Sequence, residues 1–169
     1  DGIRDTNSCL VGSEMCIRDR LSIAVALERE SMQLTVNQLG SALNIEALTL
    51  IIKEDQVGLA EWEGANPVRL LDPKPLHYKG SFTNPDAMTI SPGSWFFNES
   101  NGLLIYRINH IEQFGGGRAV PEHVRFRVET RYEDKNGNRL RDAGERITGL
   151  RFRALDQYHW QSEVAGTEN

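Results

Sequence analysis

Oxygen-bearing side chains between residues 134 and 145 have the spacing of a calcium-binding loop. Ca²⁺ is a hard cation that takes roughly six to eight oxygen ligands in proteins. In a loop numbered from residue 134, such side chains fall at positions 1, 3, 5, 9 and 12, and a backbone carbonyl is available at position 7. The candidate ligands are Asp134, Asn136, Asn138, the carbonyl of Leu140, Asp142 and Glu145. The spacing therefore predicts a calcium site.

The loop departs from this pattern at one position. It resembles the D-x-N-G-N-G-x-x-D-x-G-E loops of many bacterial envelope and surface proteins, but Arg139 replaces their second glycine. That glycine allows a sharp bend, and its replacement places a cation beside the candidate ligands. The alternative interpretation, which this departure favours, is a hairpin turn at Asn136 and Gly137 whose acidic residues contribute solubility.

No other set of residues has the spacing of an active site. The histidines at positions 77, 110, 123 and 159 show no metal-ligand spacing with one another. The glycines at 115–117 are not followed by the Lys-Ser/Thr pair of a phosphate-binding loop. We therefore expect no enzymatic activity, and no cofactor other than calcium.

Composition narrows the possible functions further. The chain of 169 residues carries a formal net charge of −5 at pH 7, which argues against binding nucleic acid through bulk positive charge. Both cysteines, Cys9 and Cys16, lie in the first 20 residues, so we expect no disulfide framework in the rest. The length suits one domain.

Residues 1–20 do not match the remainder of the chain. They lack helical or strand periodicity, and LVGSEMCIRDR resembles the translation of a transposon adapter used to prepare sequencing libraries. We therefore expect residues 1–20 to be a non-native scar and the native sequence to enter near Leu21, with its own start missing. The alternative is a genuine disordered N-terminus.

Residues 21–54 predict one long helix. The segment opens with the apolar run LSIAVAL and then becomes amphipathic, with apolar residues at three- and four-residue steps. The apolar positions of the second half are Met32, Val36, Leu39, Leu43, Ala47, Leu50 and Ile51. Because that stripe needs a covering surface, we expect a sheet to pack on it. The apolar start is either the end of a membrane anchor or a helix N-terminus buried in a soluble core.

The rest of the chain predicts an antiparallel sheet, and hence an α+β fold. Residues 55–93 form an irregular connection, with a helical turn that starts at Asn66-Pro67 and one short strand near 77–82. Strands are expected at 94–98 and 103–110, joined by a hairpin turn, and at 123–133 and 147–160. The sheet region thus spans 94–160, and 161–169 form a polar tail.

The outward face of the last two strands is rich in arginine. Arg125, Arg127 and Arg131 alternate with Val124, Phe126 and Val128, and Arg151 and Arg153 follow the same alternation. Such a face could hold phosphates. The favoured alternative is a solvated face with cross-strand ion pairs, because Glu129, Glu133 and Asp156 are interspersed.

The order of these elements resembles that of the type IV pilins and the pseudopilins of type II secretion. The segments that most resemble this family in sequence are LSIAVALERESMQLTVNQLGSAL, GANPVRLL and SWFFNESNGLLIYR. The last of them is similar to a pattern of minor pilin-like proteins. The processed glycine and following glutamate of that family do not occur in this chain, so no residue is assigned to processing or methylation.

The resemblance implies a structural subunit of an envelope filament in the bacterial inner membrane and periplasm. Its partners would be other pilin-like subunits, and a missing first half of the helix would anchor it in the inner membrane. Glu28, Arg29 and Glu30 would set subunit register without affecting the stability of the isolated domain. The alternative is a membrane-anchored or soluble periplasmic binding module, with a ligand surface near Trp62, Trp95, Tyr106 and Trp160.

Overall fold

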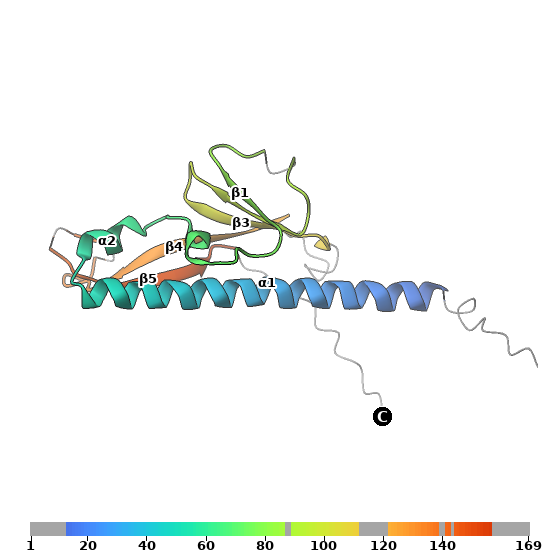
Figure 1. The fold of residues 1–169 in the computed structure, drawn as a ribbon, viewed down its shortest axis with the longest axis horizontal. Coiled ribbons are helices and arrows are strands. Elements are labelled where there is room, and N and C mark those ends of the chain that lie inside the picture. The colour runs from blue at the N-terminus through green and yellow to red at the C-terminus, as the bar shows by residue number, and fades with distance from the viewer. Residues whose placement is uncertain (1–12, 87–88, 112–121, 139–140, 143, 157–169) are drawn as a thin grey trace, which may run out of the picture.

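The computed structural model shows one long helix lying along a five-stranded sheet (Figure 1). It describes residues 13–86, 89–111, 122–138, 141–142 and 144–156. The helices are α1 (Ser13–Ile52), α2 (Gln56–Glu61) and the 3₁₀ helix η1 (Pro67–Leu70). The strands are β1 (Tyr78–Phe82), β2 (Ser94–Asn98), β3 (Leu103–Arg107), β4 (His123–Tyr132) and β5 (Ile147–Ala154). The predicted α+β class is therefore confirmed.

Helix α1 is longer at its start than the sequence pattern predicts. It begins at Ser13 rather than Leu21, because no proline or glycine between them stops the helix from propagating. Its end is a Schellman arrangement, in which the Asp55 amide donates to the Leu50 carbonyl at 2.9 Å and Glu54 has a φ of 56°. The first 12 residues of the predicted scar lie outside the described residues.

Short elements after α1 are capped by side chains. Helix α2 lies where the sequence predicts irregular chain, because the carboxylate of Asp55 accepts the Gly58 amide at 2.8 Å and supplies an N-cap. Helix η1 starts as predicted, with the Asn66 side chain accepting the Val68 amide at 3.0 Å. Only the second cap follows a familiar Asn-Pro signal.

The sheet order is β1-β2-β3-β4-β5, and the last four strands form an antiparallel meander. The expectation of a wholly antiparallel sheet is wrong at β1, which pairs with β2 in parallel. Two neighbouring strands that are parallel need a connection that returns the chain to the end where the first strand began, and a two-residue hairpin cannot do this. The predicted hairpin is confirmed, since Asn98 pairs with Leu103.

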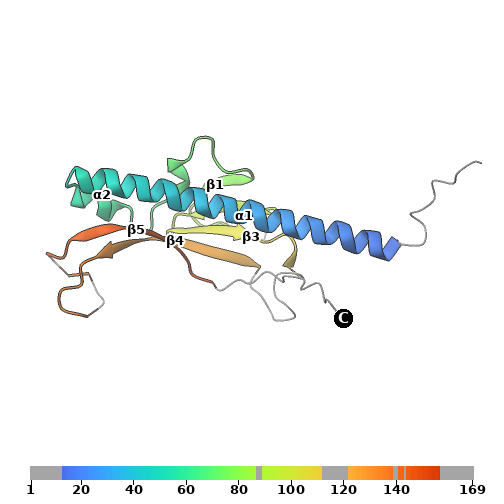
Figure 2. The same ribbon diagram turned by 90° about the horizontal axis from the view of Figure 1, so that it is seen from below.

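The core lies between α1 and one face of the sheet (Figure 2). Met32 and Leu39 pack with Trp95, Phe126 and their neighbours, and this confirms that the apolar face of β4 covers the helix stripe. Further along, Leu43, Ala47 and Leu50 pack with Val128, Ile147 and Leu150. Phe96, Leu103 and Ile105 form a smaller cluster on the other face with Ile90, so the central hairpin is buried on both sides.

Two glycines allow the segment after α2 to approach the sheet closely. The Gly64 amide donates to the Val128 carbonyl at 2.9 Å, beyond the point where β3 pairs with β4. Gly102, in the β2–β3 turn, has a φ of +65°, and a Cβ there would lie 2.6 Å from the Gly64 carbonyl oxygen. The hairpin turn and this segment can therefore meet only if residue 102 has no side chain.

We expect Gly102→Ala to destabilise the fold far more than Gly137→Ala. Gly137 also has a positive φ (+73°), but nothing lies within 4 Å of its Cβ position. Its substitution should cost about 1–2 kcal/mol of unfolding free energy from backbone strain alone. At Gly102 the clash should add about 1–3 kcal/mol more. Urea unfolding of both variants measures the difference, and equal losses would contradict the close approach.

Candidate functional site

The predicted calcium loop connects β4 to β5 and is closed by its own polar side chains. Asp134 Oδ1 accepts the Gly137 amide at 2.7 Å. The side-chain amides of Asn136 and Asn138 both donate to Asp142 Oδ2, at 2.5 and 2.7 Å. Four of the candidate ligands therefore lie in one turn. The carbonyl of Leu140 lies outside the described residues.

Glu145 is buried, and its carboxylate is used within the loop. Its Oε1 accepts the Lys135 amide and its Oε2 accepts the Asp142 amide, both at 3.0 Å. A position-12 glutamate in a calcium loop directs both oxygens at the metal. Here the carboxylate joins the two ends of the loop, so calcium would have to compete with two backbone amides for it.

The donor set fits calcium only in part. Asn136 and Asn138 face Asp142 with their side-chain nitrogens, and Asn136 Oδ1 accepts the Asn138 backbone amide at 3.0 Å, so both side-chain amides would have to turn for their oxygens to bind calcium beside Asp142. Glu145 faces the backbone. Among the described residues, no group of three or more His, Cys, Asp or Glu side chains could hold a metal ion. Hydrogen bonds among the described residues of the loop, such as those of Asp134, Asp142 and Glu145, are also those of a plain turn. Calcium binding stays a prediction.

The buried carboxylate of Glu28 fixes α1 to the sheet. Glu28 accepts the Tyr106 hydroxyl at 2.9 Å and the Asn109 amide at 2.7 Å through Oε1. Its Oε2 accepts the His110 amide at 3.2 Å and lies 2.6 Å from His110 Nδ1. The expectation that Glu28 is available for subunit register is therefore wrong, since its carboxylate binds groups of its own chain.

The Glu28 carboxylate also affects Tyr106. Burial chiefly, and then the charge of Glu28 and its hydrogen bond, raise the pKa of the Tyr106 hydroxyl well above its usual value of 10.0. The hydroxyl thus stays protonated and donates to Glu28 throughout the ordinary pH range. No spacing rule links residues 28, 106 and 110, so only the folded chain reveals this cluster.

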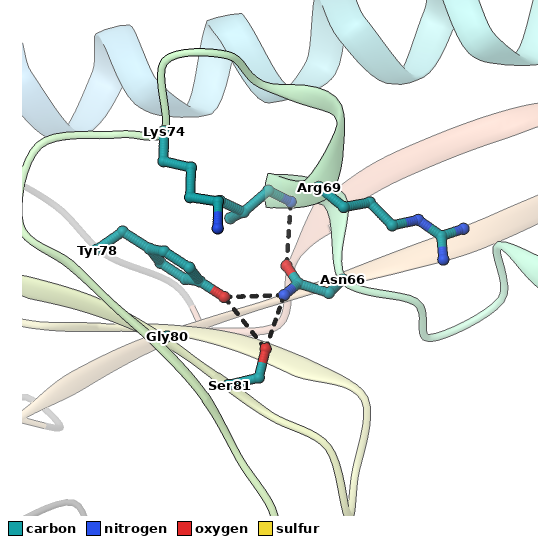
Figure 3. A pocket seen from close by; sticks show the side chains of 7 residues that line it. Asn66, Arg69, Lys74, Tyr78, Gly80 and Ser81 are labelled. Atoms are coloured by element: carbon teal, nitrogen blue, oxygen red, sulfur yellow. Dashed lines mark hydrogen bonds between the residues drawn. The ribbon is translucent and has the colours of Figure 1, made fainter.

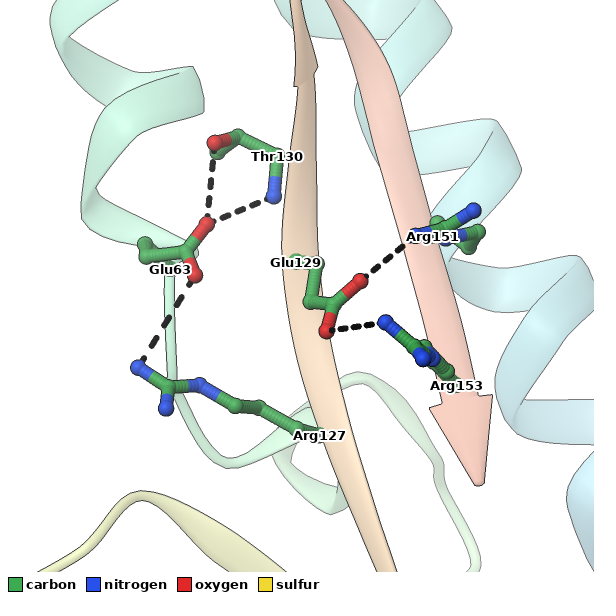
Figure 4. A network of polar contacts seen from close by, with 6 residues as sticks. All are labelled: Glu63, Arg127, Glu129, Thr130, Arg151 and Arg153. Atoms are coloured by element: carbon green, nitrogen blue, oxygen red, sulfur yellow. Dashed lines mark hydrogen bonds and ion pairs between the residues drawn. The ribbon is translucent and has the colours of Figure 1, made fainter. Parts of the chain in front are cut away.

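The arginine-rich face is paired across strands, as the favoured alternative predicts. Glu129 of β4 binds Arg151 at 2.7 Å and lies 3.5 Å from Arg153, both on β5 (Figure 4). Glu63 accepts the backbone amide and the hydroxyl of Thr130 at 2.6 and 2.9 Å. These contacts hold β4, β5 and the segment after α2 together.

Asp156 forms a separate ion pair with Arg125, another arginine of this face. The Arg125 guanidinium donates to both Asp156 oxygens, at 2.7 and 2.9 Å. These hydrogen bonds lower the pKa of Asp156 below its usual value, because they favour the ionised carboxylate. The carboxylate thus stays ionised, and the pair remains, until the pH falls below the ordinary range of an aspartate.

The aromatic residues proposed as a ligand surface do not form one. Trp62, Trp95 and Tyr106 are buried in the core. Trp95 contacts the Tyr106 and Phe126 rings at centroid distances of 4.8 and 5.5 Å. Trp160 lies outside the described residues. The binding-module alternative therefore loses three of the four residues on which it rests.

Helix α1 carries a second apolar stripe that the fold leaves uncovered. Its members are between 59% and 82% exposed, and they are Ile23, Leu27, Leu34, Ile45, Leu48 and Ile52. At about 100° per residue, all six fall within a sector of about 60°. The residues that pack on the sheet, such as Met32, Leu39 and Leu43, lie on the opposite side of the helix.

The start of α1 extends beyond the sheet. Figures 1 and 2 both show the blue part of the helix projecting past the strands. At 1.5 Å per residue, the 40 residues of α1 span about 60 Å. Glu28 is the first buried residue described along it. In the described part of the chain, no helix combines the length and apolarity needed to cross a membrane.

We expect Glu28→Ala to lower the unfolding free energy by about 3–5 kcal/mol, because it leaves buried donors without their acceptor. The matched control is Glu30→Ala, which removes an exposed carboxylate two residues away and should change stability by no more than about 0.5 kcal/mol. Thermal unfolding of both variants provides the comparison. Equal melting temperatures would show that Glu28 does not fix α1 to the sheet.

Comparison of the chain with protein-family models, with curated proteins and with solved structures found no match. The arguments for function therefore start from the described residues themselves. Among them, the exposed stripe of α1 and the loop between β4 and β5 are two features from which a function can be argued.

Proposed function

We propose that this chain is a structural subunit of a filament of the type IV pilus or type II secretion pseudopilus kind. The observation that carries the proposal is the apolar stripe on α1, opposite the face that packs on the sheet. A helix that is apolar on two opposite sides suits a position between its own sheet and a second surface. In a filament, that surface is the corresponding helix of a neighbouring subunit.

The energetics of the stripe support a packing role. Burying a large aliphatic side chain is worth roughly 1.5–3 kcal/mol. Leu27, Leu34 and Leu48 lie on a seven-residue repeat, with Ser41 at the remaining position. A repeat of this kind keeps the stripe facing a partner helix along several turns. The stripe therefore has the pattern expected of a helix–helix contact.

A groove adjoins the stripe. It has a volume of about 820 Å³ and lies between α1 and the proline-containing segment 71–76. Ile45 belongs to both the stripe and the groove, and Leu76 is exposed on the far side. A neighbouring helix on the stripe could therefore bring side chains into this groove, which would enlarge the contact.

In this proposal the chain functions by assembly and carries no catalytic role. It belongs to the inner membrane and periplasm, as its resemblance to pilins implies. Since Glu28 is used within the chain, subunit register is assigned to the exposed charges of Arg29 and Glu30, of which Glu30 lies within the sector of the stripe.

We expect Leu34→Glu with Leu48→Glu to weaken self-association of the chain at least tenfold, because two charges would enter an apolar contact. The matched control is Gln33→Glu with Asn44→Glu, which adds the same charges to exposed positions outside the stripe. Sedimentation velocity over a concentration series measures association. Both double variants should keep the melting temperature of the parent chain, since all four side chains are already exposed.

The size of the assembled species tests the filament itself. A head-to-tail contact extends beyond the dimer, whereas a two-fold contact stops there. Species larger than a dimer, lost in the stripe variant and kept in the control, are the expected result. A chain that stays monomeric at high concentration, or equal weakening by both variants, would contradict the proposal.

We propose calcium as a ligand of the loop from Asp134 to Glu145, with the candidate residues identified above. Calcium that binds only the folded state raises its stability, by about 2.7 kcal/mol at a hundred times the dissociation constant. An extracellular module of this type saturates at roughly 0.1–1 mM. We therefore expect calcium to raise the melting temperature and chelation to reverse the change.

Two matched variants distinguish calcium binding in this loop from a general effect of negative charge. Asp142→Asn should abolish the calcium response, whereas Glu133→Gln, an exposed acid beside the loop, should keep it. Calorimetric melting with calcium, with magnesium and with chelator makes the comparison. A melting temperature that is the same with calcium and with chelator would remove the calcium role.

A further inference from the structure

A small polar pocket lies among η1, the loop before β1 and β1 itself (Figure 3). Its volume is about 140 Å³, enough for a small organic molecule. The polar residues that line it are Asn66, Arg69, Lys74, Tyr78 and Ser81. No aspartate or glutamate is among its lining residues, so the walls provide positive charge and hydrogen-bond donors.

The orientation of the Asn66 amide follows from its role as the N-cap of η1. Its Oδ1 accepts the Val68 amide at 3.0 Å, so its Nδ2 must donate. That nitrogen lies 2.8 Å from the Tyr78 hydroxyl and 3.0 Å from Ser81 Oγ. Both hydroxyl oxygens therefore act as acceptors toward Asn66.

One hydroxyl proton is then left for a ligand. The two hydroxyl oxygens lie 3.3 Å apart, so one of them can donate to the other. Asn66 already uses its amide as the donor toward both oxygens, and each hydroxyl carries a single proton. The second hydroxyl proton can therefore be donated to an acceptor in the pocket.

The charge at the rim has the sign that suits an anion. In Figure 3 the Lys74 side chain extends toward the side of the pocket that holds Tyr78. The Arg69 guanidinium instead stacks on the Trp62 ring, 3.8 Å from its centroid, so its stem forms part of the wall. An ammonium beside a hydroxyl donor gives an oxyanion charge-assisted hydrogen bonds, which are stronger than neutral ones.

We propose that this pocket binds an oxyanion group, a carboxylate or a phosphate, held by Lys74 and by the hydroxyl pair Tyr78–Ser81. Asn66 acts as a positioning residue, because its amide fixes the two hydroxyls. The same chemistry could come from a free anion or from an acidic side chain of a polypeptide. The site does not depend on the filament proposal, since none of its residues belongs to the stripe of α1, although Lys74 also lines the groove between α1 and segment 71–76.

The test is a titration of the full chain, followed by amide chemical shifts in NMR spectra, at constant ionic strength. Inorganic phosphate and a short oligoglutamate peptide are the two probes. We expect saturable shifts centred on Gly80 and Ser81. A response to phosphate identifies a free anion as the ligand, and a response to the peptide alone identifies a side-chain carboxylate.

Matched lysine variants make the test specific. Lys74→Gln should weaken binding about tenfold, the loss of one charge-assisted hydrogen bond. Lys79→Gln removes the same charge from the neighbouring strand position outside the pocket and should weaken binding less than about twofold. Shifts that do not saturate with either probe, or equal weakening by both variants, would overturn the proposal.

Discussion

The packing of α1 on one face of the sheet is the interaction on which the rest of the structure depends. Both large core clusters contain residues of α1, and each contains residues of β4 or β5. Without the helix, the apolar side chains of Trp95, Phe126 and Leu150 would be exposed to water. Each large side chain would then lose a burial free energy of roughly 1.5–3 kcal/mol. The buried carboxylate of Glu28 then fixes where along the helix this packing begins, because Tyr106, Asn109 and His110 all donate to it.

Local sequence signals predicted the elements, and contacts between distant residues decided how they join. The alternation of Val124, Phe126 and Val128 with arginines identified β4 and its buried face, because a strand places successive side chains on opposite sides. Asn66-Pro67 likewise marked the start of η1. The parallel pairing of β1 could not be predicted in this way, because strand direction depends on how the connection between β1 and β2 runs and not on a residue pattern within either strand.

The candidate calcium loop shows the same contrast between what local sequence signals predict and what contacts in the folded chain decide. Ligand spacing identified a turn whose side chains do converge, since Asn136 and Asn138 both bind Asp142. Spacing could not show that Glu145 is directed at the backbone amides of Lys135 and Asp142. A carboxylate satisfies whichever donors the folded chain brings to it, and here the donors are the loop's own backbone. The partners of Glu28 were even harder to predict from the sequence, because they lie about 80 positions further along the chain.

The use of Glu28 inside the fold also limits how α1 can recognise a neighbour. Of the three charged residues 28–30, Arg29 and Glu30 are exposed. At about 100° per residue, Glu30 falls within the sector of the stripe, whereas Arg29 lies about 100° outside it. Apolar packing along a uniform stripe does not select one axial position, whereas a single carboxylate within the stripe does, because a shifted register would bury Glu30 against apolar side chains without a partner. In the proposed filament, the stripe would supply the strength of the helix–helix contact, and Glu30 within it would supply the register.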